Sequence, residues 1–186
     1  ANRQLGISTN TLSKSTEKLS SGYRINRAAD DAAGLSISEK MRSQIRGLNK
    51  ASSNAQDGIS AIQTAEGALN EAHSILQRMN ELATQSANDT NTTADRTAVQ
   101  SEVNALTNEL SRIASTSQFN TQNLLDGTFT GKNLQVGALE NQKITISIGT
   151  MNATALGVNS LDVKSFAKAG SAMTLIQKAI SKVSGQ

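Results

Sequence analysis

The sequence contains no cysteine, no proline and no tryptophan, and it has only one tyrosine, three phenylalanines and one histidine. Without cysteine, no disulfide can stabilise the fold, and neither a zinc–thiolate cluster nor a Cys/His catalytic pair can be built. A hydrophobic fraction of 37% with so few bulky side chains does not favour a thick globular core. It favours thin layers of closely packed helices.

Long apolar runs are also absent. No stretch of the chain approaches the roughly 20 apolar residues that cross a bilayer, which predicts no membrane insertion. The first six residues lack the apolar centre of a secretory signal. The net charge of +3 is small, and acidic residues interrupt the basic stretch between residues 24 and 50. Because Tyr23 is the only aromatic residue near that stretch, the sequence does not indicate nucleic-acid binding.

The residues that could carry catalysis are too few and too scattered. His73 is the single histidine and is expected on a helix surface or in helix packing. Asp30 and Asp31 precede a predicted helix, where acidic side chains favour the positive end of the helix dipole. The glycine-containing run 127–131 lacks the Gly-Lys-Ser/Thr of a phosphate loop. We therefore predict that the chain is not an enzyme and binds neither a cofactor nor a metal.

A seven-residue repeat is the main pattern that the chain does have. Between residues 33 and 86, large side chains recur at one repeat position, and small ones fill the position three residues later, as in Ala51, Gly58, Ala65 and Ala72. Such a repeat is typical of helices packed side by side with a slight left-handed supercoil. The glycines of this stretch fit either a tolerant helix or close helix–helix or subunit–subunit contact. The predicted packing seam consists of Met41, Leu48, Ile62, Leu69 and Leu76.

The other elements follow from periodicity and turn residues. Helices are predicted over about 33–87 and 93–116, joined by a polar turn, with Thr92 and Asp95 marking the start of the second. The short turn favours an antiparallel helical hairpin. A β-hairpin region is expected over about 118–160, and a returning helix over about 169–184. The fold class is mainly α: a long antiparallel helical rod, similar to a coiled-coil bundle, with a small β-hairpin region.

Three segments of the chain carry a close resemblance to a known family. They are the run from Lys18 to Leu48, which includes Ser-Gly-Tyr-Arg-Ile-Asn-Arg-Ala-Ala-Asp-Asp-Ala-Ala-Gly, the run from Gln56 to Asn70, and Phe119-Asn120 with Leu124-Leu-Asp-Gly127. This sequence resembles the bacterial flagellins. The resemblance implies an extracellular structural subunit that polymerises with its own kind into the flagellar filament for swimming motility. It also implies flagellar export chaperones as partners and secretion through the flagellar export apparatus. Residues 1–32 would then belong to the inner-tube helix and spoke, and residues 33–186 to the rod domain.

The chain departs from the family pattern at both ends. The C-terminal helices that pair with the N-terminal ones in flagellins are largely missing, as are the short N-terminal lead and the outer variable domains. A small flagellin trimmed at both ends is therefore expected, and this chain alone is expected to stay soluble. Two other interpretations remain open: a hook–filament junction protein with similar helical ends, and a generic coiled-coil binding module.

The run from Gln77 to Ser86 resembles the rod patch that host Toll-like receptor 5 recognises in many flagellins. An antiparallel hairpin would bring Glu102 alongside this patch. Asn80 departs from the pattern, because receptor-active members commonly carry arginine there. The alternative is that Arg78 is solvated or lies between subunits. The matching positions, and so the receptor-binding candidates, are Gln77, Arg78, Glu81, Leu82 and Glu102.

Overall fold

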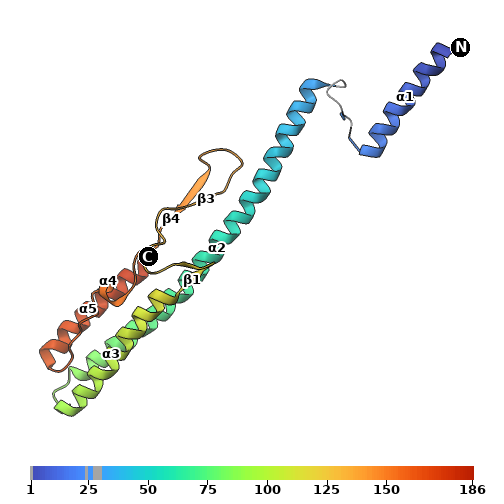
Figure 1. The fold of residues 1–186 in the computed structure, drawn as a ribbon. Coiled ribbons are helices and arrows are strands. Elements are labelled where there is room, and N and C mark those ends of the chain that lie inside the picture. Colours follow the sequence, from blue (N-terminus) through green and yellow to red (C-terminus); the bar gives the residue numbers. More distant parts are fainter. Residues whose placement is uncertain (1, 24, 27–30) are drawn as a thin grey trace. The chain divides into compact units, whose positions relative to one another are not determined.

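The computed structural model describes residues 2–23, 25–26 and 31–186, and within them the fold is mainly α (Figure 1). Two pairs of short antiparallel strands accompany the helices. The expected fold class, long helices with a small antiparallel strand region, is confirmed. The helices are α1 (Asn2–Ser21), α2 (Ala32–Ser86), α3 (Thr93–Thr116), α4 (Ala153–Leu156) and α5 (Phe166–Ser184); the strands are β1 (Gln118–Phe119), β2 (Gln122–Asn123), β3 (Lys132–Gln135) and β4 (Lys143–Ile146).

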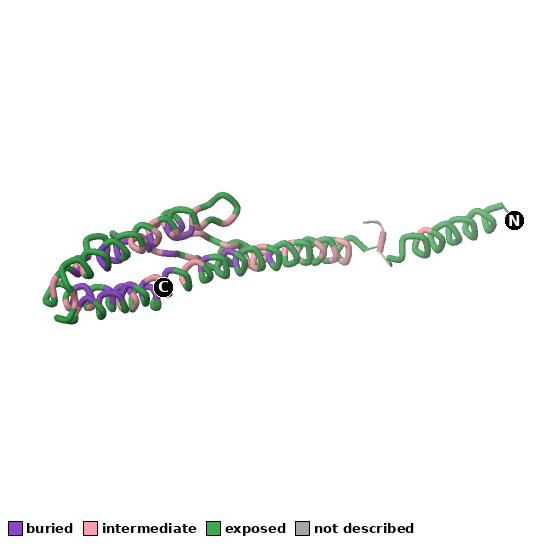
Figure 2. The backbone as a smooth tube through the Cα atoms, turned by 90° about the horizontal axis from the view of Figure 1, so that it is seen from below, coloured by how far each residue is buried: buried purple, intermediate pink, exposed green. Residues whose placement is uncertain are grey.

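The chain forms two compact units. The first comprises Ala1–Ser53 and Val136–Gln142, and the second comprises Asn54–Gln135 and Lys143–Gln186. Figure 2 shows that buried residues are concentrated in the second unit, whereas α1 is exposed almost throughout. The assignment of residues 1–32 to an inner tube and of the remainder to a rod concerns a filament, and it stays a prediction.

In the first unit, α2 begins with a capping contact. The Asp31 carboxylate accepts a hydrogen bond from the Gly34 backbone N–H at 2.8 Å, which satisfies one of the free donors of the first turn. This is the role expected for an acidic residue at a helix start; Asp30 lies outside the described residues. Further along α2, the Arg42 guanidinium lies 4.2 Å from the centre of the Tyr23 ring, a cation–π contact.

In the second unit, α2 and α3 form the helical hairpin that the polar turn predicts. Thr92 caps α3 through a reciprocal capping box with Asp95, as the sequence indicated. The core lies between α2, α3 and α5 and continues into the loops that follow α3. Its fully buried large side chains include Leu76, Met79, Val103, Leu110, Leu124, Val158 and Ile176. α5 starts at Phe166, a little before the range that the periodicity gave.

The segment before α5 is attached to the helices by two buried polar side chains. The Gln100 amide donates to the Leu161 carbonyl and accepts from the Val163 N–H, both at 2.8 Å. Ser86, at the end of α2, donates to the Val163 carbonyl at 2.5 Å. These contacts satisfy backbone groups that would otherwise be buried without partners, and they fix where α5 begins.

The strand pairs pack closely on α2. β3 pairs with β4 so that Leu134 lies opposite Ile144, and β1 joins β2 through a turn in which Asn120 and Thr121 both have positive φ. A Cβ atom on Gly58 would collide with the Leu134 side chain. Gly58 therefore allows a close approach of the strand β3, and not of another helix or subunit as the sequence suggested, whereas nothing lies within 4 Å of a Cβ atom placed on Gly67.

The predicted packing seam differs from the observed burial. Leu76 is fully buried and Leu69 is half-buried, but Met41, Leu48 and Ile62 are 56%, 53% and 45% exposed. Within this chain these three residues are therefore not packing residues, and that part of the seam prediction is corrected. The physical reason is that the chain covers the other repeat position, where small side chains let neighbouring backbone come close. The buried small residues at that repeat position are Ala51, Gly58, Ala65 and Ala72.

Candidate assembly and recognition surfaces

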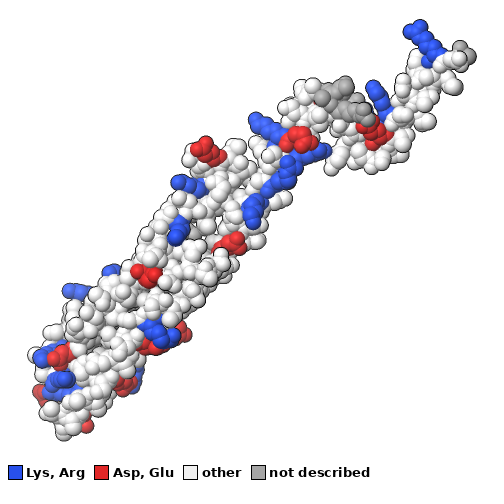
Figure 3. Space-filling view, viewed as in Figure 1, with Lys and Arg blue, Asp and Glu red and all other residues white. Residues whose placement is uncertain are grey.

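The described residues offer surfaces for contact and no recognisable catalytic centre. Among them, no three His, Asp or Glu side chains lie close enough together to hold a metal ion. In that same part of the chain, no helix combines the length and apolar character that crossing a bilayer requires. His73 hydrogen-bonds the Gln77 amide at 3.0 Å on the surface of α2. On the face of the molecule seen in Figure 3, acidic and basic side chains are interspersed around the α2–α3 turn.

The first unit leaves large apolar side chains exposed on two helices. α1 buries none of its residues, and Leu5, Leu12 and Leu19 are 71%, 68% and 86% exposed. In the first unit α2 carries a second uncovered apolar face, because residues spaced four, four and three apart lie on one side of a helix. Those residues, all more than half exposed, are Ile37, Met41, Ile45 and Leu48. Contiguous exposed apolar faces of this kind mark contact with other protein surfaces.

The receptor-binding candidates are centred on Arg78. Its guanidinium donates to the Glu102 carboxylate at 2.9 and 3.1 Å, which links α2 to α3, and to the Glu81 carboxylate at 3.1 Å. Hydrogen bonds to Glu102 and then Glu81 raise the pKa of Arg78 above its ordinary value. The antiparallel hairpin thus brings Glu102 beside Arg78, as the sequence predicted, and about half of each side chain stays exposed.

Two neighbours of Arg78 differ from the expected surface. Leu82 is 1% exposed and belongs to the core, so it is not part of the exposed patch and instead supports it from beneath. Asn80 is half-buried, and its side-chain oxygen has no hydrogen-bond partner. The exposed patch accordingly comprises Gln77, Arg78, Glu81 and Glu102, which we call the Arg78 patch.

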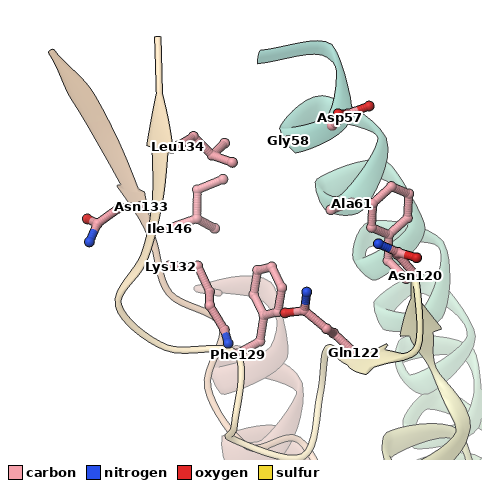
Figure 4. Close-up of a pocket in the computed structure, with 11 residues that line it drawn as sticks. Asp57, Gly58, Ala61, Asn120, Gln122, Phe129, Lys132, Asn133, Leu134 and Ile146 are labelled. Carbon is pink, nitrogen blue, oxygen red and sulfur yellow. The ribbon is translucent and has the colours of Figure 1, made fainter. Parts of the chain in front are cut away.

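The structure also contains a pocket that no sequence motif indicated. It has a volume of ≈ 230 Å³ and lies in the second unit between α2, the β1–β2 turn and the β3–β4 pair (Figure 4). Phe119, Phe129 and Leu134 supply apolar wall, and Lys132 lies over the Phe129 ring at 5.7 Å. Gly58 is the local signal in the sequence, and a glycine by itself does not predict a pocket.

Comparison with known proteins agrees with a structural rather than a catalytic role. The family model described as "Bacterial flagellin N-terminal helical region" matches residues 1–130. A flagellin of Halalkalibacterium halodurans is 52% identical over 186 residues, which cover 99% of this chain and 68% of the relative. A flagellar filament core protein of Brachyspira hyodysenteriae is 47% identical over all of this chain and 70% of its own length.

Further relatives agree. A flagellin of Clostridium tyrobutyricum is 59% identical over 162 residues, which cover 83% of this chain and 43% of the relative, so the chain spans less than half of that protein. The crystal structure of Bacillus cereus flagellin superimposes with a TM-score of 0.59 at 31% identity, covering 70% of this chain and 76% of that one. The surfaces and the fold together define a structural protein that acts through contacts. The chain belongs to the bacterial flagellin family, whose members are structural proteins and not enzymes.

Proposed function

We propose that this chain forms part of a subunit that polymerises with further copies into a flagellar filament used for swimming. The observation that carries the proposal is the exposed apolar surface of α1 and of the first unit's α2, from Leu5 to Leu48. A free soluble protein gains nothing from leaving such faces in water, whereas a polymer buries them between its subunits. Relatives named flagellin and flagellar filament core protein support the same role.

Location and export follow from this role. A filament subunit acts outside the cell, and we infer that the protein reaches the filament through the flagellar export apparatus. Flagellar export chaperones are the expected partners before assembly. The apolar residues of α1 would be one surface for a chaperone to cover, because they are exposed until subunits meet.

The proposal is tested by replacing the matched region of the Halalkalibacterium halodurans flagellin with this chain. The chimera retains the relative's segments outside the match, and the 186-residue chain alone is the control. We expect the chimera to form long filaments in the electron microscope and the chain alone to stay soluble. A chimera that folds but never polymerises would contradict the proposal, and assembly that stops at a short ring would favour the hook–filament junction protein instead.

We also propose that the Arg78 patch is a surface that host Toll-like receptor 5 recognises. Arginine is enriched at interface hot spots, and here two carboxylates hold its guanidinium in a fixed position on a rigid helix pair. Such preorganisation reduces the entropy lost on binding. Asn80, in place of the arginine common in receptor-active flagellins, is expected to weaken the affinity.

Arg78→Ala should weaken binding of the receptor ectodomain by about 2 kcal/mol or more, as for an interface hot spot. Arg112→Ala is the matched control, because Arg112 is a half-exposed arginine that pairs with Glu109 three residues before it. Titration of the ectodomain against both variants and the unchanged protein measures the effect. Equal affinities of the receptor ectodomain for all three proteins would show that the Arg78 patch does not bind the receptor.

A further inference from the structure

The pocket beside Gly58 has the dimensions and the lining of a site for an aromatic side chain. A cavity of about 150 Å³ suffices to hold benzene, and this pocket measures ≈ 230 Å³. Two of the three phenylalanines of the chain, Phe119 and Phe129, contribute to its walls. Figure 4 shows Leu134 and Ile146 directed from the strands toward Ala61 on α2, with Gln122 and Lys132 at one end beside Phe129.

The backbone at the rim of this pocket is strained. Asn120 and Thr121 both have positive φ, at 46° and 63°, and for a β-branched residue such as Thr121 that conformation is a true outlier. Strained residues persist where the surrounding structure over-determines them, and they are frequent at binding sites. In this protein Asn120, in the strained turn, and Gln122, which follows it, both line the pocket.

The third phenylalanine is uncovered elsewhere in the same unit. Phe166 is the first residue of α5 and is 59% exposed, the largest exposed fraction of any large hydrophobic residue in the second unit. It lies at the end of the unit where Val163 contacts Ser86, the last residue of α2. Burial of a phenylalanine ring is strongly favourable, so the exposure of Phe166 leaves a substantial apolar contact unused.

The ring and the pocket lie at different positions along the axis of α2. Gly58 and Ser86 are separated by roughly 40 Å at 1.5 Å rise per residue. A patch and a pocket at different places on one molecule make a heterologous contact, and a heterologous contact that does not close into a ring generates an open row of subunits. The pair therefore suits a polymer better than a symmetric dimer.

We propose that Phe166 of one copy inserts into the pocket beside Gly58 of the next copy, so that identical units join head to tail. In this contact Lys164, exposed two residues before Phe166, would pair with Asp57, which is exposed at the pocket. Lys132 also lines the pocket, where it lies over the Phe129 ring. The third phenylalanine would complete an aromatic cluster with Phe119 and Phe129, whose rings offer edge-to-face contacts. This inference rests on the proposed polymerisation and names two surfaces that meet in it.

Disulfide trapping tests the contact without background, because the chain has no cysteine of its own. One variant carries Ala167→Cys beside Phe166, the other carries Gln122→Cys at the pocket, and both positions are exposed. The two proteins are mixed and oxidised, in concentrated solution and in any filaments that form. In an equimolar mixture random collision gives twice as many mixed dimers as either kind of like dimer. We expect an excess several-fold above that twofold ratio.

A second substitution in the Ala167→Cys protein tests whether the excess of mixed dimers depends on the Phe166 ring. Phe166→Ala should abolish it, whereas Leu175→Ala, which removes another exposed apolar side chain of α5, should leave it unchanged. No preference for mixed dimers, or a preference that survives Phe166→Ala, would overturn the inference. If filaments form without a preference for mixed dimers, the proposed function stands and this contact is refuted. If the preference depends on Phe166 but no filaments form, the contact stands and the proposed polymerisation is refuted.

Discussion

At the scale of single residues, the fold depends on a few polar side chains that satisfy backbone groups. The Gln100 amide forms the hydrogen bonds that a neighbouring strand would otherwise supply to the segment before α5. It donates to the Leu161 carbonyl and accepts from the Val163 N–H. Asp126 organises the turn after β2, where its carboxylate accepts from Thr128 N–H and Oγ1 and from the Asn123 amide. Neither contact is visible in the sequence, because each joins a common polar residue to partners that only folding brings near.

Gln100→Leu should lower the free energy of unfolding by about 2 kcal/mol or more, because it leaves the Leu161 carbonyl and the Val163 N–H buried without partners. Denaturant unfolding followed by circular dichroism measures the change. Gln63→Leu is the control: Gln63 is exposed on α2, and substitutions at such positions usually change stability by no more than about 0.5 kcal/mol. If both variants unfolded alike, the Gln100 contacts would have no net stabilising effect.

Asp126 should contribute to acid sensitivity. Hydrogen bonds, chiefly from Thr128 and then Asn123, hold the pKa of its carboxyl below the ordinary value. A pKa that is lower in the folded state gives stability that is present above the unfolded value of about 3.9 and is lost as pH falls through the folded value. Asp126→Asn should therefore unfold more easily than the unchanged protein near neutral pH, and the difference should shrink below about pH 4.

Denaturant midpoints measured at both pH values decide this prediction. Asp57→Asn is the matched control, because the Asp57 carboxylate takes part in no hydrogen bond or ion pair that the described residues show, so the substitution removes a carboxylate without breaking such a contact. If the denaturant midpoints of Asp126→Asn and the unchanged protein differed by the same amount at neutral and at acid pH, the Asp126 carboxylate would not stabilise this turn as described.

At the scale of elements, sequence periodicity predicted the helices well and their partners poorly. The spacing of apolar residues and the Thr92–Asp95 pair suffice to indicate α2, the turn and α3, because helix caps and stripes are local properties. The repeat in α2 carries two apolar registers, and the residues alone did not reveal which one the same chain covers. The pocket and the close approach at Gly58 were missed because they depend on contacts between segments far apart in the sequence.

A pair of substitutions within the second unit tests the difference in burial along the predicted seam of α2. Leu76→Ala should lower the free energy of unfolding by about 2–5 kcal/mol, because Leu76 is fully buried. Ile62→Ala should cost less than about 0.5 kcal/mol, since Ile62 is 45% exposed and alanine favours helices. Comparable losses for both variants in denaturant melts would mean that Ile62 packs within the chain after all.

At the scale of the whole molecule, exposed apolar surface is the property that connects sequence, structure and proposed function. The chain has few aromatic residues, and it leaves apolar residues of α1 and α2 in water. A protein of this family can keep such surface if polymerisation covers it. Polymerisation would also explain why Met41, Leu48 and Ile62 are exposed. Residues that do not pack within one chain remain available for contact with other segments and other subunits.

Helical reconstruction by cryo-electron microscopy of filaments containing this chain tests that claim most directly. In the isolated chain, 45–56% of the surface of Met41, Leu48 and Ile62 is exposed. We expect neighbouring subunits, or the segments that the chimera adds, to cover these three side chains in the filament. Filaments in which these three side chains still face solvent would contradict this expectation.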